Sequence, residues 1–138
     1  MAKTKWTEEL VLKVVKECRE AGIAAAAAKL AELQGKGSQY AVMDGNRCVG
    51  EMLDVCGFAN VKLKSARGNF FKLAKKLSSD RTQNYRFHCA NHYYGGGHFS
   101  VFDCYMGQEM SVNKAAMQGV ATVLSGYGIE CYVESRID

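Results

Sequence analysis

The fold is decided by residues 84–138, which read NYRFHCANHYYGGGHFSVFDCYMGQEMSVNKAAMQGVATVLSGYGIECYVESRID. Alternating apolar and polar side chains predict strands over 84–90 and 129–134, and an apolar and aromatic run predicts an inner strand over 99–105. Apolar residues at helical spacing predict a helix over 111–125. The glycines at 95–97 favour a hairpin turn between the first two strands. The predicted order is strand, hairpin, strand, helix, strand.

The segment before this stretch adds one more strand and one more helix. Ala59, Val61 and Leu63 alternate with polar residues, as in a half-buried strand over 58–64. Apolar residues at helical spacing then run from Phe70 to Leu77. The order from residue 58 is β-α-β-β-α-β, the ferredoxin-like arrangement in which two helices cover one face of a four-stranded antiparallel sheet. We therefore predict an α+β fold with a ferredoxin-like sheet.

The N-terminal part is predicted to be mainly helical. Thr7 can cap a helix that ends or bends at Gly22, and the alanine-rich residues 23–34 predict a second helix, so the two form a helical hairpin. Residues 40–43 predict a short strand that turns at 44–46. A short helix or a loop is expected over 49–56. We expect one domain, 1–138, made of a helical part (1–57) and a βαββαβ core (58–138).

Length and composition favour a protein that folds without staples. The chain has 138 residues, of which 48% are hydrophobic, enough to bury one core. Its six cysteines do not follow an apolar signal segment, so we expect reduced thiols and a cytoplasmic location in the host cell. No apolar run approaches the length that spans a bilayer, so we expect no membrane partner.

Basic side chains concentrate in the middle of the chain. Residues 58–81 hold seven basic and one acidic side chain, a net charge of +6, whereas the whole chain carries +4. Such a block can steer a polyanion or an acidic protein surface toward one face; the alternative is a solvated helix that uses lysine for solubility. The candidate basic binding residues are Lys62, Lys64, Arg67, Lys72, Lys75, Lys76 and Arg86.

Aromatic side chains complete the candidate surface: Tyr93, Tyr94, Phe99 and Tyr105. Two tyrosines beside three glycines suit insertion into a partner, because tyrosine is enriched at interfaces. Residues 98–105 are also similar in outline to the inner-strand motif of RNA-recognition domains, on whose rings bases stack. The motif lacks the basic and glycine residues at its start, and Glu130 and Glu134 would repel phosphate.

Two chemical alternatives remain at this stage. Cys89, His92, His98 and Cys104 have zinc-ligand residue types, although Cys104 lies within a predicted strand rather than on a tight knuckle. A cysteine, a histidine and Asp103 or Asn91 would supply a nucleophile set, but no local signature of such an enzyme is present. Buried cysteines more often act as small apolar residues. We therefore predict no metal and no cofactor.

From residue 56 onward the chain resembles small uncharacterised proteins encoded by phages and mobile elements. The resemblance is one of pattern and rests on Cys56-Gly-Phe-Ala59, Val61, the helix from Arg67-Gly-Asn-Phe70 to Leu77, Tyr93-Tyr-Gly-Gly96, Met110-Ser111, Lys114-Ala115, Gly128-Ile129 and Ser135-Arg136-Ile137-Asp138. No activity comes with this family. The resemblance implies a viral or mobile-element setting, where small single-domain proteins often act by binding, including as inhibitors of host defence nucleases.

These observations lead to one functional expectation and two alternatives. We expect a non-enzymatic phage or mobile-element protein that binds another protein, with inhibition of a host nucleic-acid-handling or defence complex, as anti-CRISPR proteins do, as one form of action. The first alternative is a module that binds single-stranded DNA or RNA on the open sheet face. The second is a zinc-binding protein or a cysteine-dependent enzyme.

Overall fold

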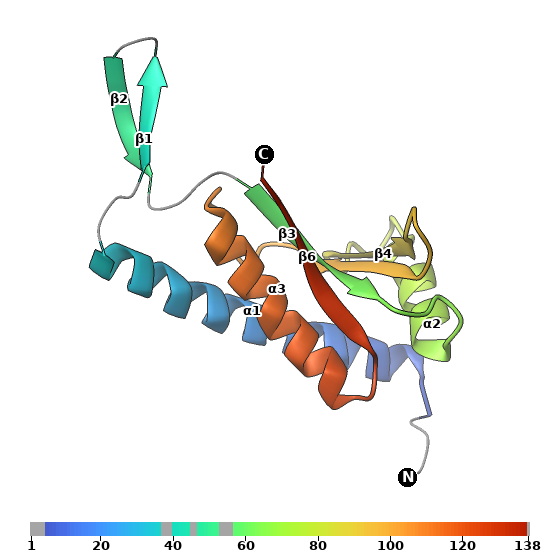
Figure 1. Ribbon diagram of the computed structural model, residues 1–138. Helices are drawn as coiled ribbons and strands as arrows, with labels where there is room; N and C mark the ends of the chain where they lie inside the picture. The colour runs from blue at the N-terminus through green and yellow to red at the C-terminus, as the bar shows by residue number, and fades with distance from the viewer. Residues whose placement is uncertain (1–4, 37–39, 45–46, 53–56, 138) are drawn as a thin grey trace.

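The structure is a computed structural model that describes residues 5–36, 40–44, 47–52 and 57–137, without the side chains of 40–52. Three helices and six strands follow one another in this part of the chain: α1 (Glu8–Lys36), β1 (Tyr40–Asp44), β2 (Arg47–Met52), β3 (Gly57–Leu63), α2 (Asn69–Ser78), β4 (Phe87–Asn91), β5 (Gly97–Val101), α3 (Met110–Gly126) and β6 (Cys131–Ile137). Strands β1 and β2 form an antiparallel hairpin that stands away from the rest in Figure 1.

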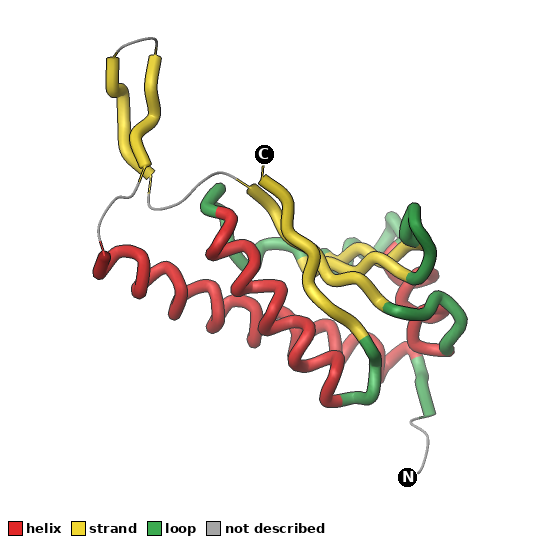
Figure 2. The backbone as a smooth tube through the Cα atoms, viewed as in Figure 1, coloured by secondary structure: helices red, strands yellow, loops and turns green. Residues whose placement is uncertain are grey.

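The other four strands form an open antiparallel sheet in the order β4-β5-β3-β6. The helices lie together on one side of this sheet, as Figure 2 shows, with α3 against β3 and β6, α2 against β4, and α1 packed along α3. The prediction of an α+β fold with a four-stranded antiparallel sheet is therefore confirmed.

The core lies between the sheet and the helices. Every second residue of the central strands points into it, and Val61, Leu63 and Phe99 are almost completely buried. A chain of aromatic rings crosses this core: Trp6 lies 4.9 Å from Phe70, Phe70 lies 5.9 Å from Phe99, and Phe99 lies 5.8 Å from Phe87. Since the strand period is two, the residues between these positions are left on the opposite face of the sheet.

The predicted N-terminal hairpin is replaced by the single helix α1, because Gly22 serves packing rather than a turn. Gly22 is buried, and a Cβ atom there would lie 2.7 Å from the Cys104 Sγ atom and 3.2 Å from the Ala116 carbonyl oxygen. On the facing helix, a Cβ at Gly119 would lie 2.6 Å from the Ala21 carbonyl oxygen. The two glycines thus allow α1 and α3 to approach closely, and α1 lies on the helical side of the sheet.

Several other predicted boundaries are wrong for local reasons. Where a short helix or a loop was expected over 49–56, the structure has strand β2 up to Met52, and residues 53–56 lie outside the described residues. The strand predicted from residue 84 begins only at Phe87, because Asn84 and Arg86 have positive φ angles of 38° and 62°. The inner strand ends at Val101, before Asp103 with a φ of 65°. In both places the strand is limited by residues with positive φ angles, which the alternation of side chains in the sequence does not reveal.

Candidate protein-binding face

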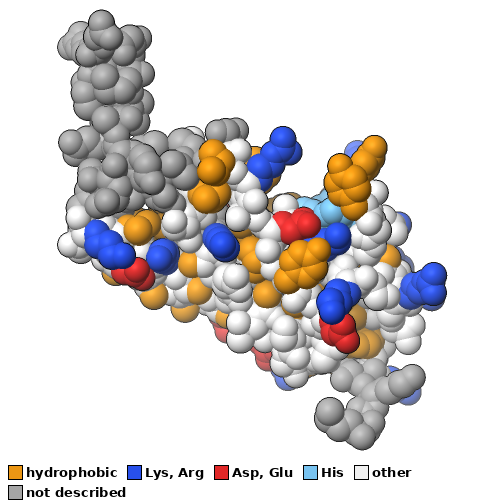
Figure 3. Space-filling model, viewed as in Figure 1, with side chains coloured by type: hydrophobic (Ala, Val, Ile, Leu, Met, Phe, Trp, Pro, Cys, Tyr) orange, Lys and Arg blue, Asp and Glu red, His pale blue; other side chains and the backbone are white. Residues whose placement is uncertain are grey.

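The sheet face that the helices leave uncovered carries an unusual set of polar and aromatic side chains. We call it the open face and define it by Phe58, Asn60, Lys62, His88, Ala90, His98, Ser100, Tyr132, Glu134 and Arg136. Within the described residues, no helix packs on it. Figure 3 shows hydrophobic, histidine, acidic and basic side chains gathered around this part of the molecule. A surface so mixed is chemically suited to binding another macromolecule.

All three histidines of the chain lie at the open face, and His92 anchors the β4–β5 loop. The Tyr94 backbone N–H donates to His92 Nδ1 at 3.0 Å, and His92 Nε2 lies 3.0 Å from Glu134 Oε2. Because Nδ1 accepts a hydrogen bond, the ring proton resides on Nε2 and is donated to Glu134. We call this pair of bonds the His92 anchor. It ties the loop that follows β4, at one edge of the sheet, to β6 at the opposite edge. The sequence did not predict the His92 anchor. The one feature that could have indicated it is the presence of three histidines between residues 88 and 98.

Beside this anchor, two buried polar atoms have no hydrogen-bond partner within the described residues: His98 Nδ1 and Asn60 Oδ1. The His98 ring lies 5.4 Å from the His88 ring, edge to face. Burial lowers the pKa of His98, the neighbouring His88 and His92 lower it further, and Glu134 opposes them. His98 is thus favoured as a neutral ring with a nitrogen that a bound partner can satisfy.

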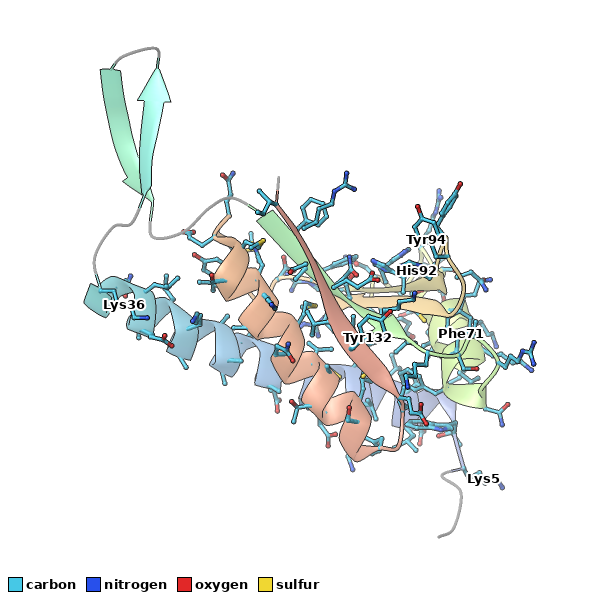
Figure 4. The ribbon with its side chains drawn as sticks, in the orientation of Figure 1. Lys5, Lys36, Phe71, His92, Tyr94 and Tyr132 are labelled. Carbon is cyan, nitrogen blue, oxygen red and sulfur yellow. The ribbon has the colours of Figure 1, made fainter. Side chains whose placement is uncertain are left out.

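The loop presents two tyrosines to solvent. Tyr93 is 91% exposed and Tyr94 82% exposed, and their rings meet edge to face at 4.9 Å. Figure 4 places His92 and Tyr94 together at this loop, with Tyr132 on β6. The Lys62 ammonium lies 5.8 Å from the centre of the Tyr132 ring. Large aromatic side chains that are exposed on an anchored loop are typical contact residues of protein interfaces.

A shallow depression continues the open face along β3 and β6. It has a volume of about 380 Å³ and is lined by Phe58, Asn60, Glu134, Ser135 and Arg136. Phe58 is 49% exposed at its rim. The depression gives a partner a small recess next to the unsatisfied Asn60 oxygen.

The basic residues predicted as one surface are divided between the two sides of the sheet. Lys62 lies on the open face, whereas Lys72, Lys75 and Lys76 belong to α2 on the helical side. Three of the predicted cations form ion pairs: Lys64 with Glu130 at 3.4 Å, Lys76 with Glu8 at 2.8 Å, and Arg86 with Asp103. Lys75 donates to Asn91 Oδ1 at 2.7 Å, and Arg67 is exposed. The structure therefore does not bring these basic residues together on one side of the sheet.

Two of the predicted aromatic contacts are buried or partly buried. Phe99 is fully buried, because the odd-numbered side chains of β5 point toward the helices. Tyr105 is partly buried and donates to both carboxylate oxygens of Glu109, at 3.1 and 3.0 Å; burial and this bond raise its pKa to about 12. The open positions of the central strands hold Asn60, Lys62 and Ser100 beside the rings of Phe58 and His98, and neither Phe99 nor Tyr105 is among them.

The zinc set does not assemble. Cys89 is buried on the helical side, whereas His98 lies on the open face, so the sheet separates them. Among the described residues, no group of three metal-ligating side chains converges. Burial raises the pKa of Cys89 and Cys18 to about 12, which leaves both thiols protonated and poor nucleophiles.

Comparison with family models, with curated proteins and with solved structures gives no match for this chain. No helix among the described residues combines the length and apolar character needed to cross a membrane.

Proposed function

We propose that this protein is a non-enzymatic binding module that engages another protein through the open face and the β4–β5 loop. The observation that carries the proposal is a pair of tyrosines, 91% and 82% exposed, on a loop anchored by His92 and Glu134. The anchor reduces the ordering cost of binding, because the loop is held before a partner arrives. Tyr93 and Tyr94 then contribute apolar area and hydroxyl groups at little entropic cost.

The surroundings of the loop favour a protein partner over a nucleic acid. Phosphate binding draws on unpaired cations, and several candidate cations already hold carboxylates. Base stacking needs rings on the central strands, where Phe58 is exposed but most other open positions are polar. The partner that fits is a protein surface with an apolar recess for the tyrosines and an acidic group opposite Lys62.

The sequence resemblance supplies the setting of the proposal. The chain acts in the cytoplasm of a host cell as a phage or mobile-element product, and its partner belongs to a host nucleic-acid-handling or defence complex. The element order β-α-β-β-α-β from β3 to β6 and the strand order β4-β5-β3-β6 support a ferredoxin-like assignment of the core. A fold of this kind hosts many functions, so the loop and the open face carry the proposal.

The test compares capture of host proteins by the wild-type chain and by a Tyr93→Ser, Tyr94→Ser double variant. Phe102→Ser is the matched control, because Phe102 is also an exposed aromatic residue, 46% exposed, but lies after β5 rather than in the loop. We expect the double variant to lose the captured partner and the control to retain it. Equal capture by all three chains would refute the proposal. Tight, steeply salt-dependent binding of short RNA or DNA would favour the nucleic-acid alternative instead.

A further inference from the structure

The two edge strands of the sheet, β4 and β6, differ in whether a side chain binds their outer backbone groups. At the β4 edge, the Ser78 hydroxyl donates to the Cys89 carbonyl oxygen at 3.1 Å and accepts the Cys89 N–H at 3.1 Å. One side chain from α2 thus blocks the centre of that edge against pairing with another strand. At the other edge, β6 extends over seven residues with no comparable cover from the part of the chain that the structure describes. In Figure 1, β6 lies at the front of the sheet and β4 behind it.

The alternation of hydrogen-bonded and non-hydrogen-bonded residue pairs between β3 and β6 shows which backbone groups β6 leaves unpaired. The Lys64 N–H donates to the Glu130 carbonyl oxygen at 3.0 Å, so the bonded pairs alternate from there along the ladder. Even-numbered residues of β6 therefore direct their N–H and C=O groups toward β3. The odd-numbered residues Val133, Ser135 and Ile137 direct theirs outward, where no backbone partner exists among the described residues. This is a strand edge ready to accept another strand.

We propose that β6 pairs antiparallel with β6 of a second copy of this chain, joining two four-stranded sheets into one. The pairing is centred on Ser135, which faces its own counterpart. In this register Glu134 of each copy lies directly opposite Arg136 of the other, and Val133 lies opposite Ile137. Opposite charges and apolar pairs in these positions stabilise an antiparallel ladder.

The identity of the occupant follows from the charges of β6 itself. Arg136 has no ion pair within the described residues, and Glu134 uses only Oε2 for His92, so Oε1 can accept an arginine. A register centred on Glu134 would set two carboxylates face to face, which disfavours it. Ile137, 64% exposed in the single chain, becomes covered by Val133 of the second copy. The strand is thus complementary to itself.

The test is the oligomeric state in sedimentation equilibrium over a wide range of concentrations. Ser135→Pro removes only an outward N–H and is tolerated on an edge, so β3–β6 pairing survives while pairing between copies is lost. Ser135→Ala is its matched control. Arg136→Glu sets like charges opposite each other and raises the dimer dissociation constant about tenfold or more. Arg81→Glu, an exposed reversal that precedes the β4 edge, leaves it unchanged.

We expect dimers for the wild type, Ser135→Ala and Arg81→Glu, and monomers for Ser135→Pro and Arg136→Glu. Hydrogen exchange at the Val133 and Ser135 amides should be slow in the dimer and fast in Arg136→Glu. A wild-type chain that stays monomeric overturns the proposal, as does a dimer that survives both disruptive substitutions; if Ser135→Pro does not fold, Arg136→Glu decides. The experiment needs no partner protein, so its result is independent of the proposed function.

Discussion

Gly119→Ala tests the close contact between α1 and α3. The new Cβ would lie 2.6 Å from the Ala21 carbonyl oxygen and 3.2 Å from the Ala25 Cβ atom, both on α1. Because a backbone oxygen cannot rotate away, the helices must separate, and overpacking of this kind costs about 1–3 kcal/mol. Replacing glycine by alanine inside a helix gains about 1 kcal/mol, which offsets part of the loss. We expect a net destabilisation of up to about 2 kcal/mol.

The matched control is Gly126→Ala, at the end of the same helix, where a Cβ meets nothing within 4 Å. It should be neutral or stabilising by up to about 0.5 kcal/mol, since only propensity changes and the last turn is frayed. Urea unfolding followed by far-ultraviolet circular dichroism measures both values. If Gly119→Ala were as stable as Gly126→Ala, the helices would not be in the contact described, and the continuous α1 would lose its explanation.

Three further predictions concern side chains near the sheet. Because the pKa of His98 in the folded protein lies below its ordinary 6.5, the unfolded chain binds more protons than the folded one. The free energy of unfolding should therefore fall as the pH drops from neutral through 6.5. In urea titrations, His98→Gln should make this pH dependence flatter. In the native protein Cys18 and Cys89 should resist iodoacetamide at pH about 8, as mapped by mass spectrometry, and rapid labelling of Cys89 would contradict its burial. His92→Ala should speed hydrogen exchange at the Tyr94 amide, whereas unchanged exchange would show that the ring does not hold the loop.

The sequence predicted correctly those elements in which apolar side chains recur at strand or helix spacing over the whole element. Alternation over β3 and helical spacing in α2 and α3 predicted both their type and their order. The strand ends could not be predicted, because Arg86 and Asp103 adopt positive φ angles that neither residue type demands. Gly22 was misread for a related reason: a glycine that breaks a helix and a glycine that admits a neighbour look the same in one sequence.

The candidate site was predicted only in part. The exposure of Tyr93 and Tyr94 was predicted correctly, because a pair of aromatic residues beside glycines indicates an exposed loop. The basic residues were expected together, because a count of charges does not show that α2 and Lys62 lie on opposite sides of the sheet. The His92 anchor depends on Glu134, 42 residues away, and tertiary structure alone brings them together.

Photo-crosslinking in the natural host tests the central claim most directly. A benzophenone amino acid placed at Tyr93 should form a covalent adduct with one host protein, whereas the same group at Phe102 should not, since that side chain lies outside the loop. Protein adducts at residue 93 alone are the predicted result. Adducts of equal yield at both positions, or adducts to nucleic acid only, would contradict a protein partner bound at the loop.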